Sequence, residues 1–395
     1  MLNQSVLALG KKRSTIREIF EYGNLRAAQV GRENIFDFSI GNPNVPAPDA
    51  VRRAILDIVQ GDPCAVHGYT SAQGAPQARQ AITDNLNARF GTQYTAEQLY
   101  LTVGAAASIS ICFKALTASP EDEFIIFAPF FPEYTVFIEQ GAGAKCVIVP
   151  AQDADFQIDF DAFEARLTAH TKGVVVNSPN NPSGVVYSDE TVARLAEILT
   201  RKSEEYGHPI YLISDEPYRE IVYDGRETSF VAKAYPRTLV CYSYSKSLSL
   251  PGERIGYVLV PQVEEFGDLY AAVCGAGRVL GYVCAPSLFQ QVAARCADET
   301  ADLSVYEENR RLLFEGLTQM GYSCVKPDGA FYLFPRTLEA DDRAFCERAK
   351  KYDLLLVPGT DFGAPGHMRI SYCVQTETIR RALPLFRRLA EEYGR

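Results

Sequence analysis

One lysine of this sequence has the surroundings of a reactive amine. Lys246 follows the strand-like run 239–242, lies among serines that include Ser243 and Ser245, and precedes Arg254. Loss of solvation or a neighbouring cation lowers the pKa of a lysine from about 10.4, and the free amine then forms a Schiff base with a carbonyl group. Hydroxyl groups and an arginine suit an anion. The stretch therefore indicates an amine beside an anion site, whereas a lysine taken alone is usually a solvated surface charge.

Polar side chains follow two other strand-like runs. Asn181 lies in a proline-rich turn after 174–176, and Asp215 and Tyr218 follow 210–214. A carboxylate at the end of a buried strand is unfavourable unless a cation pairs with it. Asp215 therefore requires a positively charged partner, and Tyr218 is placed to donate a hydrogen bond to the same partner.

Three loops give weaker signals. Gly104, Ala105 and Ala106 open a helix, where free amides and the positive end of the helix dipole suit a phosphate, although small residues there mostly serve packing. Phe131 stands in an aromatic loop between prolines and is placed to stack on a flat ring, or simply belongs to the core. Gly41 begins a proline-rich turn that predicts a boundary after an N-terminal arm and turns an amide toward a ligand.

These loops must be positioned by alternating helices and strands. Continuous Val, Ile and Leu runs between helical segments predict a mostly parallel sheet covered on both faces, whose ligands bind at the carboxyl ends of the strands. The C-terminal third alternates in the same way and predicts a smaller α+β domain. The expected helices are 14–26, 77–90, 105–116 and 189–206, and the expected strands are 34–40, 99–103, 124–127, 146–149, 174–176, 210–213, 331–334, 354–359 and 368–372.

Composition excludes several classes of protein. The 395 residues are 47% hydrophobic and 22% charged, which predicts a large core, and the formal net charge of −10 comes without a basic stripe that would indicate nucleic-acid binding. Ten cysteines without a C-x-x-C pair read as free thiols of a reducing compartment, and four scattered histidines argue against a metal site. The absence of a signal core and of a long apolar run predicts a cytoplasmic protein without a membrane partner.

Three motifs together resemble the signature of class I/II pyridoxal-phosphate aminotransferases of fold type I. They are Asn-Asn-Pro-Ser-Gly at 180–184, Asp-Glu-Pro-Tyr at 215–218, and Ser-Tyr-Ser-Lys-Ser followed by Pro-Gly-Glu-Arg-Ile-Gly within 243–256. The resemblance implies a large domain with a seven-stranded, mostly parallel sheet and a smaller α+β domain. On this basis we expect an N-terminal arm with part of the small domain at 1–45, a large cofactor-binding domain at 46–285 and a small domain at 286–395.

The resemblance also implies a role for each residue of the cofactor site. Lys246 would hold pyridoxal 5′-phosphate through a Schiff base and, once released by the amino acid, move the proton at the substrate Cα. Asp215 would pair with the protonated ring nitrogen and so supply the cation that its burial requires. Asn181 and Tyr218 would bind the phenolic oxygen, Phe131 rather than Phe130 would stack on the ring, and the phosphate would be bound by Ser243, Ser245, Arg254, Gly104, Ala105 and Ala106.

Other residues match the family at substrate and subunit contacts. Arg369 would clamp the substrate α-carboxylate, with Gly41 and Asn181 beside it. Tyr69 resembles the tyrosine that reaches the phosphate of the neighbouring subunit, which implies a homodimer with shared active sites. In aspartate-preferring relatives, a lysine after the phosphate-loop glycine or an arginine before a later proline-containing loop holds the distal carboxylate. Ala106 or Ala107 stands at the first position, whereas Arg278, eight residues before Pro286, lies near the second and is a candidate for a distal substrate carboxylate.

The expected activity is transfer of the amino group of an L-amino acid to a 2-oxo acid, with 2-oxoglutarate as acceptor, by a ping-pong mechanism. A lyase that eliminates at Cβ or decarboxylates would keep the same residues and is the alternative within this fold. A cofactor-sensing domain of a transcription regulator is a further alternative. About forty residues precede Gly41, however, too few for a helix-turn-helix module with its linker.

Overall fold

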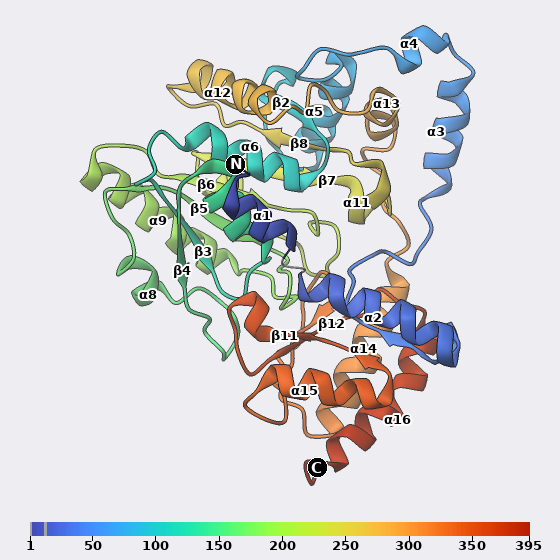
Figure 1. Ribbon diagram of the computed structural model, residues 1–395. Helices are drawn as coiled ribbons and strands as arrows, with labels where there is room; N and C mark the ends of the chain where they lie inside the picture. The colour runs from blue at the N-terminus through green and yellow to red at the C-terminus, as the bar shows by residue number, and fades with distance from the viewer. Residues whose placement is uncertain (1, 12–13) are drawn as a thin grey trace.

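A seven-stranded sheet forms the centre of the computed structural model, which describes residues 2–11 and 14–395 (Figure 1). The strand order is β2-β8-β7-β6-β5-β3-β4. Strand β8 pairs antiparallel with β2 and β7, and the other neighbouring pairs of this sheet are parallel. The predicted mostly parallel sheet is therefore confirmed. Its strands are β2 (Leu99–Thr102), β3 (Glu123–Phe127), β4 (Lys145–Val149), β5 (Thr171–Asn177), β6 (Tyr211–Asp215), β7 (Thr238–Ser243) and β8 (Gly256–Leu259).

Helices cover both faces of this sheet, because alternate strand residues point to opposite sides. Val175 and Ile213 pack with α6 (Ala105–Leu116) and α12 (Phe266–Val279) on one face. On the other face, Val174 and Val176 pack with α9, while the β2, β7 and β8 residues pack with α3, α5 and α13. These covering helices are α3 (Asp49–Val59), α5 (Pro76–Phe90), α9 (Asp189–Tyr206) and α13 (Ser287–Arg295).

Shorter strands build a second region near the C-terminus. The strands β11 (Val357–Pro358), β12 (Met368–Ser371) and β9 (Tyr332–Leu333) form an antiparallel sheet, and β1 (Phe36–Asp37) pairs in parallel with β10 (Leu354–Leu355). The helices α2 (Thr15–Val30), α14 (Ser304–Gln319), α15 (Asp342–Ala349) and α16 (Thr376–Glu391) gather around them (Figure 1). An early chain segment thus joins the C-terminal region.

The remaining helices are short. They are α1 (Gln4–Lys11), α4 (Pro63–His67), α7 (Glu133–Val136), α8 (Phe160–Glu164), α10 (Val231–Ala234) and α11 (Tyr244–Ser247), with a π-helical turn at Phe137–Ala142. Single 3₁₀ turns occur at Arg32–Asn34, Ala96–Gln98, Pro251–Glu253, Lys350–Tyr352 and Gly359–Phe362. None of the helices within 2–11 and 14–395 is long and apolar enough to cross a membrane.

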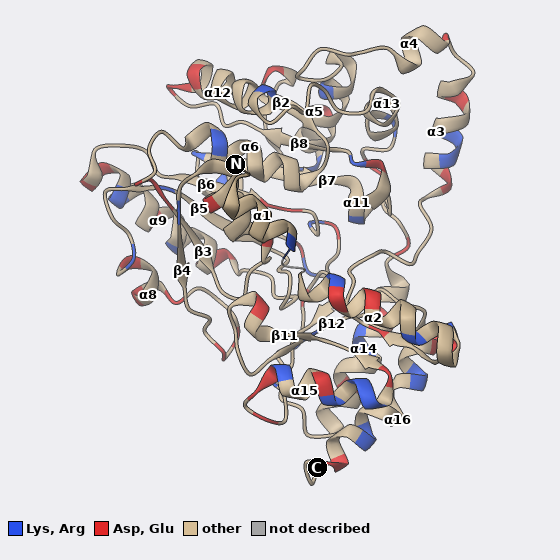
Figure 2. Ribbon diagram, in the orientation of Figure 1, with Lys and Arg blue, Asp and Glu red and all other residues tan. Residues whose placement is uncertain are grey.

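The division into segments at 45/46 and 285/286 stays a prediction. Helix α13, just beyond the second boundary, packs in the core cluster of α3 and α5, whereas α14 and α16 contribute to the cluster around β9 and β12. Acidic and basic residues are interspersed over both regions (Figure 2).

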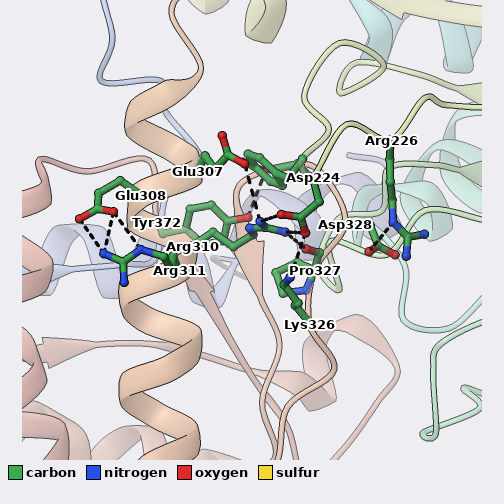
Figure 3. A network of polar contacts seen from close by, with 12 residues as sticks. Asp224, Arg226, Glu307, Glu308, Arg310, Arg311, Lys326, Pro327, Asp328 and Tyr372 are labelled. Atoms are coloured by element: carbon green, nitrogen blue, oxygen red, sulfur yellow. Dashed lines mark hydrogen bonds and ion pairs between the residues drawn. The ribbon is translucent and has the colours of Figure 1, made fainter.

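A polar cluster joins the two regions at α14 (Figure 3). Arg310 of α14 donates hydrogen bonds to both carboxylate oxygens of Asp224, at 3.0 and 2.8 Å, and to the carbonyl oxygen of Pro327 at 3.0 Å. Lys326 also reaches Asp224, at 2.9 Å. The guanidinium group of Arg310 lies over the ring of Tyr223, 4.5 Å from its centroid. A buried arginine thus ties α14 to the segment that follows β6.

Candidate active site

A cavity of about 290 Å³ opens where β5, β6 and β7 end. Loops after the large-sheet strands line it from one side, and the β1–α3 connection, β9 and β12 line it from the other. Most of the residues singled out in the sequence line this cavity: Gly41, Ala105, Ala106, Phe131, Asn181, Asp215, Tyr218, Ser243, Ser245, Lys246, Arg254 and Arg369.

Asp215 is the last residue of β6 and is 5% exposed. Its Oδ2 atom accepts a hydrogen bond of 2.5 Å from the hydroxyl group of Tyr134. Its Oδ1 atom is buried and has no hydrogen-bond partner within the described part of the chain. Burial raises the pKa of Asp215 to about 7, although the Tyr134 hydrogen bond acts in the opposite direction. Such an oxygen suits a ligand group that carries a proton and a positive charge.

Lys246 lies in α11, directly after β7. Burial, with smaller contributions from Arg369 and Arg254, lowers the pKa of Lys246 to about 8. The Nζ atom donates a hydrogen bond of 2.6 Å to the carbonyl oxygen of Gly41. An amine with this pKa is largely available in its neutral, nucleophilic form in mildly basic solution.

An anion site lies beside Lys246. Gly104 has a φ of 96° and precedes α6, whose first residues Ala105 and Ala106 line the cavity. The N–H groups of the first turn of a helix have no partner within the helix and suit an anion. A Cβ atom on Gly104 would lie 2.5 Å from Nη2 of Arg254, which is too close for any residue with a side chain. Glycine at this position therefore lets the guanidinium group of Arg254 pack against the backbone that precedes α6. The Oγ atoms of Ser243 and Ser245 lie 2.6 Å apart. Hydroxyl groups, amides and a guanidinium group form a donor set that fits a phosphate.

Tyr218 shares a hydrogen bond with a residue that the sequence did not single out. Its hydroxyl group lies 2.8 Å from that of Tyr332 of β9, and both residues line the cavity. Burial raises the pKa of the Tyr218 hydroxyl well above its usual value, so this group is a hydrogen-bond donor throughout the neutral range.

Arg369 of β12 is buried in the opposite wall. It donates from Nη1 to Oδ1 of Asn181 at 3.0 Å and from Nη2 to the carbonyl oxygen of Ser39. Its guanidinium group lies over the ring of Tyr332, 4.8 Å from the centroid, and burial lowers its pKa. Nε has no partner among the described residues. A planar guanidinium group that is held by aromatic rings and one side-chain amide suits a planar carboxylate.

Three predicted site residues, Gly104, Tyr69 and Arg278, are not among those that line the cavity of their own chain. Tyr69 is 92% exposed in the segment after α4, and Arg278 is exposed near the end of α12. Their proposed roles stay predictions, because a contact with a second chain is not part of a single-chain structure.

Three further residues complete the site. Tyr134 binds Asp215, Tyr332 binds Tyr218, and the side chain of Asn177 both donates to the backbone oxygen of Asp215 at 2.9 Å and accepts from the backbone N–H of Asn181 at 2.8 Å. Asn177 is the last residue of β5 and directly follows three valines, and a polar residue in that position could have identified it as a candidate from the sequence. Tyr134 and Tyr332 lie in aromatic runs that are equally typical of core.

Comparisons with known proteins agree with this geometry. Residues 33–385 match the family model described as aminotransferase class I and II. An aspartate/prephenate aminotransferase of Thermus thermophilus is 30% identical over 374 residues, covering 93% of this chain and 94% of the relative. An aromatic-amino-acid aminotransferase of Thermococcus litoralis is 28% identical and covers 96% of both chains.

Solved structures give the same result. An aminotransferase of Eubacterium rectale superposes with a TM-score of 0.98 at 59% identity, covering 100% of both chains. The T. thermophilus aspartate aminotransferase with maleate superposes with a TM-score of 0.85 at 29% identity, covering 98% of this chain and 99% of the other. Because the family model spans most of the sequence, this chain belongs to the class I and II aminotransferases.

Proposed function

We propose that this aminotransferase uses pyridoxal 5′-phosphate to move the amino group of an L-amino acid to a 2-oxo acid, with 2-oxoglutarate as acceptor. The observation that carries this proposal is the buried Oδ1 atom of Asp215, left without a partner in the same cavity as the Lys246 amine. A carboxylate and an amine at these strand ends fit the ring nitrogen and the aldehyde of that cofactor. Family membership supports the same assignment.

The residues of the cavity fit the remaining parts of the cofactor. Ser243, Ser245, Arg254 and the first amides of α6, after Gly104, would hold the phosphate. Phe131 would cover one face of the ring, and Asn181 with Tyr218 would bind the phenolic oxygen. When bound, the cofactor supplies an electron sink for charge that develops at the substrate Cα.

The chain's own side chains then carry out the proton chemistry. Lys246, freed by the incoming amine, takes the proton from the substrate Cα, for which a pKa of about 8 is well matched to neutral or mildly basic conditions. Arg369 binds the α-carboxylate through its two terminal nitrogens, with the Gly41 amide and Asn181 beside it. The Tyr332 and Phe362 rings hold the guanidinium plane in place, at 4.8 and 4.9 Å from their centroids.

A homodimer with shared active sites is part of the proposal. Apolar side chains are exposed on α3 and at the end of α12, among them Leu56, Val59 and Val279, as expected of a surface that another chain covers. Tyr69 would reach the phosphate of the second copy, and Arg278 would reach the distal carboxylate of a dicarboxylic substrate there. Two relatives are named for aspartate or prephenate, which supports a dicarboxylic partner.

Mixing of subunits tests the shared site. The variants Lys246→Ala and Tyr69→Ala are each expected to be inactive or nearly so, and a mixture that exchanges subunits is expected to regain part of the activity through hybrids with one intact site. A mixture as inactive as its components would contradict a role of Tyr69 across the interface.

The activity itself is tested by absorbance spectroscopy with product analysis. Wild-type protein loaded with pyridoxal phosphate is expected to show visible absorbance that Lys246→Ala lacks, to lose it with some L-amino acids, and to regain it with 2-oxoglutarate. The amino acids that act identify the donor class. Release of ammonia and pyruvate without recovery by the oxo acid would instead identify a lyase, and lack of cofactor binding would overturn the assignment of Lys246.

A further inference from the structure

Tyr134 is a buried tyrosine whose hydroxyl group forms a hydrogen bond with the carboxylate of the proposed cofactor site. It lies in α7, 2% exposed, and its hydroxyl group donates to Oδ2 of Asp215 at 2.5 Å. Tyr134 lies in the short helix after β3, whereas Asp215 is the last residue of β6. The other carboxylate oxygen, Oδ1, is buried and has no partner within 2–11 and 14–395. The two oxygens of one carboxylate are therefore in unlike surroundings.

The turn that carries Tyr134 also carries Phe131. The backbone N–H of Tyr134 donates to the carbonyl oxygen of Phe131 at 3.1 Å, and the two rings meet edge to face with centroids 5.6 Å apart. The loop after β3 therefore places one aromatic ring toward the cavity and one hydroxyl group on Asp215. Asn177 holds the same strand end through the backbone oxygen of Asp215 at 2.9 Å.

The electrostatic surroundings make this hydroxyl a permanent donor. Burial raises the pKa of Tyr134 well above its usual value, with the nearby Asp215 charge adding to the effect. The other titratable groups that face Asp215 are Glu216 next to it, Tyr218 in the following loop and Cys241 on β7, and none of these described groups is a cation. The hydrogen bond from Tyr134 thus favours the ionised form of Asp215 before a ligand enters.

We propose that Tyr134 is a positioning residue: its hydroxyl group occupies Oδ2 of Asp215, favours the ionised form of the carboxylate, and leaves Oδ1 to accept a hydrogen bond from the protonated ring nitrogen of the cofactor. This inference rests on the proposed function. It predicts that Tyr134 affects cofactor binding through Asp215 and through the ring nitrogen, rather than through packing.

The test is binding of pyridoxal phosphate to apoenzyme from pH 5 to 9, with wild type and Tyr134→Phe. Loss of a hydrogen bond to a charged group is expected to weaken binding about tenfold near neutral pH. The pH at which Asp215 ionises in the apoenzyme, followed by infrared spectroscopy of the carboxylate, is expected to rise. Tyr187→Phe, which removes the hydroxyl of another buried tyrosine, serves as the matched control and is expected to behave as wild type.

Two further measurements separate positioning from packing. In an Asp215→Asn background, Tyr134→Phe is expected to change the affinity less than twofold. A cofactor analogue with carbon in place of the ring nitrogen is expected to bind wild type and Tyr134→Phe equally. If the single variant unfolds, 3-fluorotyrosine at position 134 keeps the shape with a stronger donor and is expected to lower the pH at which Asp215 ionises.

The outcomes distinguish this inference from the function on which it rests. Wild type that binds no pyridoxal phosphate would overturn the proposed function. Wild type that binds, with Tyr134→Phe unchanged in affinity and in the ionisation of Asp215, would overturn only the role of Tyr134. An equal loss of affinity in the Asp215→Asn background would also overturn it, because the effect would then be packing.

Discussion

Two aspartates, one at the end of β6 and one in the segment after it, show how differently a carboxylate can be placed. Asp224 lies 43% exposed in the polar cluster of Figure 3, where hydrogen bonds from Arg310 and Lys326 hold its pKa well below the usual value. Asp215 is buried with one neutral donor, and burial raises its pKa to about 7. The first finds its cations within the chain; the second requires one from a ligand.

The size of a hollow does not distinguish these regions. The surface hollow beside Arg310 has a volume of about 550 Å³, against about 290 Å³ for the cavity at Lys246. In the larger hollow the charged groups Arg310, Arg311 and Lys326 are all paired. The Nε atom of Arg310 is also buried without a partner among the described residues, but the guanidinium group is paired within the chain. At Asp215 the unpartnered atom belongs to a carboxylate that lines a cavity and has no cation beside it within the described part of the chain, which indicates a binding site.

The largest expected effect comes from one chemical change made in both regions. Asp215→Asn is expected to lower kcat roughly 10³-fold, because a fixed charge opposite the ring nitrogen is lost. Asp224→Asn is expected to leave kcat within about twofold, since it removes a charge only from the cluster at α14. Steady-state kinetics checks both variants. Equal losses of activity would remove the distinction between the two aspartates.

The apoenzyme's stability is expected to depend on pH through Asp215. Its pKa is raised from 3.8 to about 7 by folding, so the folded state binds more protons than the unfolded state between these values. The stabilising contribution is present below pH 3.8 and is lost as the pH rises through 7. Relative to Asp215→Asn, wild-type apoenzyme is therefore expected to lose about 4 kcal/mol of unfolding free energy from pH 4 to pH 8.

Denaturant unfolding of the two apoenzymes across this range provides the measurement. Saturating cofactor is expected to abolish the difference in slope, because it supplies the missing cation. A difference between the two proteins that stays constant with pH would show that Asp215 is already ionised and paired.

Arg310→Ala is expected to reduce the free energy of unfolding by about 2–4 kcal/mol, through lost charged hydrogen bonds and a void over Tyr223. Arg311→Ala is the matched control, since Arg311 is half exposed and its ion pairs among the described residues are with Glu308 and Glu315 on its own helix. That change is expected to have an effect below about 0.5 kcal/mol. Arg310→Ala as stable as the control would show that the cluster does not join the two regions.

The smallest effect is expected for the stability of Asp224→Asn. Its side chain is largely solvated, so its pairs contribute under about 1 kcal/mol and weaken in high salt. Asparagine also tolerates the positive φ of 56° at this position. Unfolding in low and high salt measures this, and a loss above about 2 kcal/mol would indicate a stronger, buried pair.

Local signals predicted some elements closely. Helix α9 has the expected bounds Asp189–Tyr206, because Ser188 caps its first turn and Gly207 adopts the left-handed conformation that ends it. Helix α2 starts after its Ser14 cap as expected but extends to Val30 before Gly31 ends it. In contrast, the strand expected at 34–40 is only Phe36–Asp37, because its partner β10 offers two residues for pairing. Strand length depends on the partner, which local sequence does not contain.

The candidate site, like the fold, was predictable from the sequence only in part. Residue types at strand ends were enough to identify Lys246, Asp215 and Asn181 as candidates, because turns after buried strands meet at one edge of a parallel sheet. Arg369, which lies within β12, was identified only through the family resemblance. Tyr134 was missed because an aromatic residue that follows a loop of aromatics and prolines is typical of core, and only the folded chain shows that its hydroxyl group reaches Asp215. The role of Tyr69 depends on a second chain, and the roles of Tyr69 and Arg278 both stay predictions.

By itself, the sequence determined the alternation of elements, the identity of the groups at the strand ends and the family. The tertiary structure decided which charges meet. Arg310 reaches Asp224 across 86 positions of sequence, and Tyr134 reaches Asp215 across 81, and neither distance follows from local propensity. Coulombic and hydrogen-bond energies depend on separation in space and on burial. Only folding therefore gave Asp224 its ion pair with Arg310 and left Asp215 with an oxygen available to a ligand.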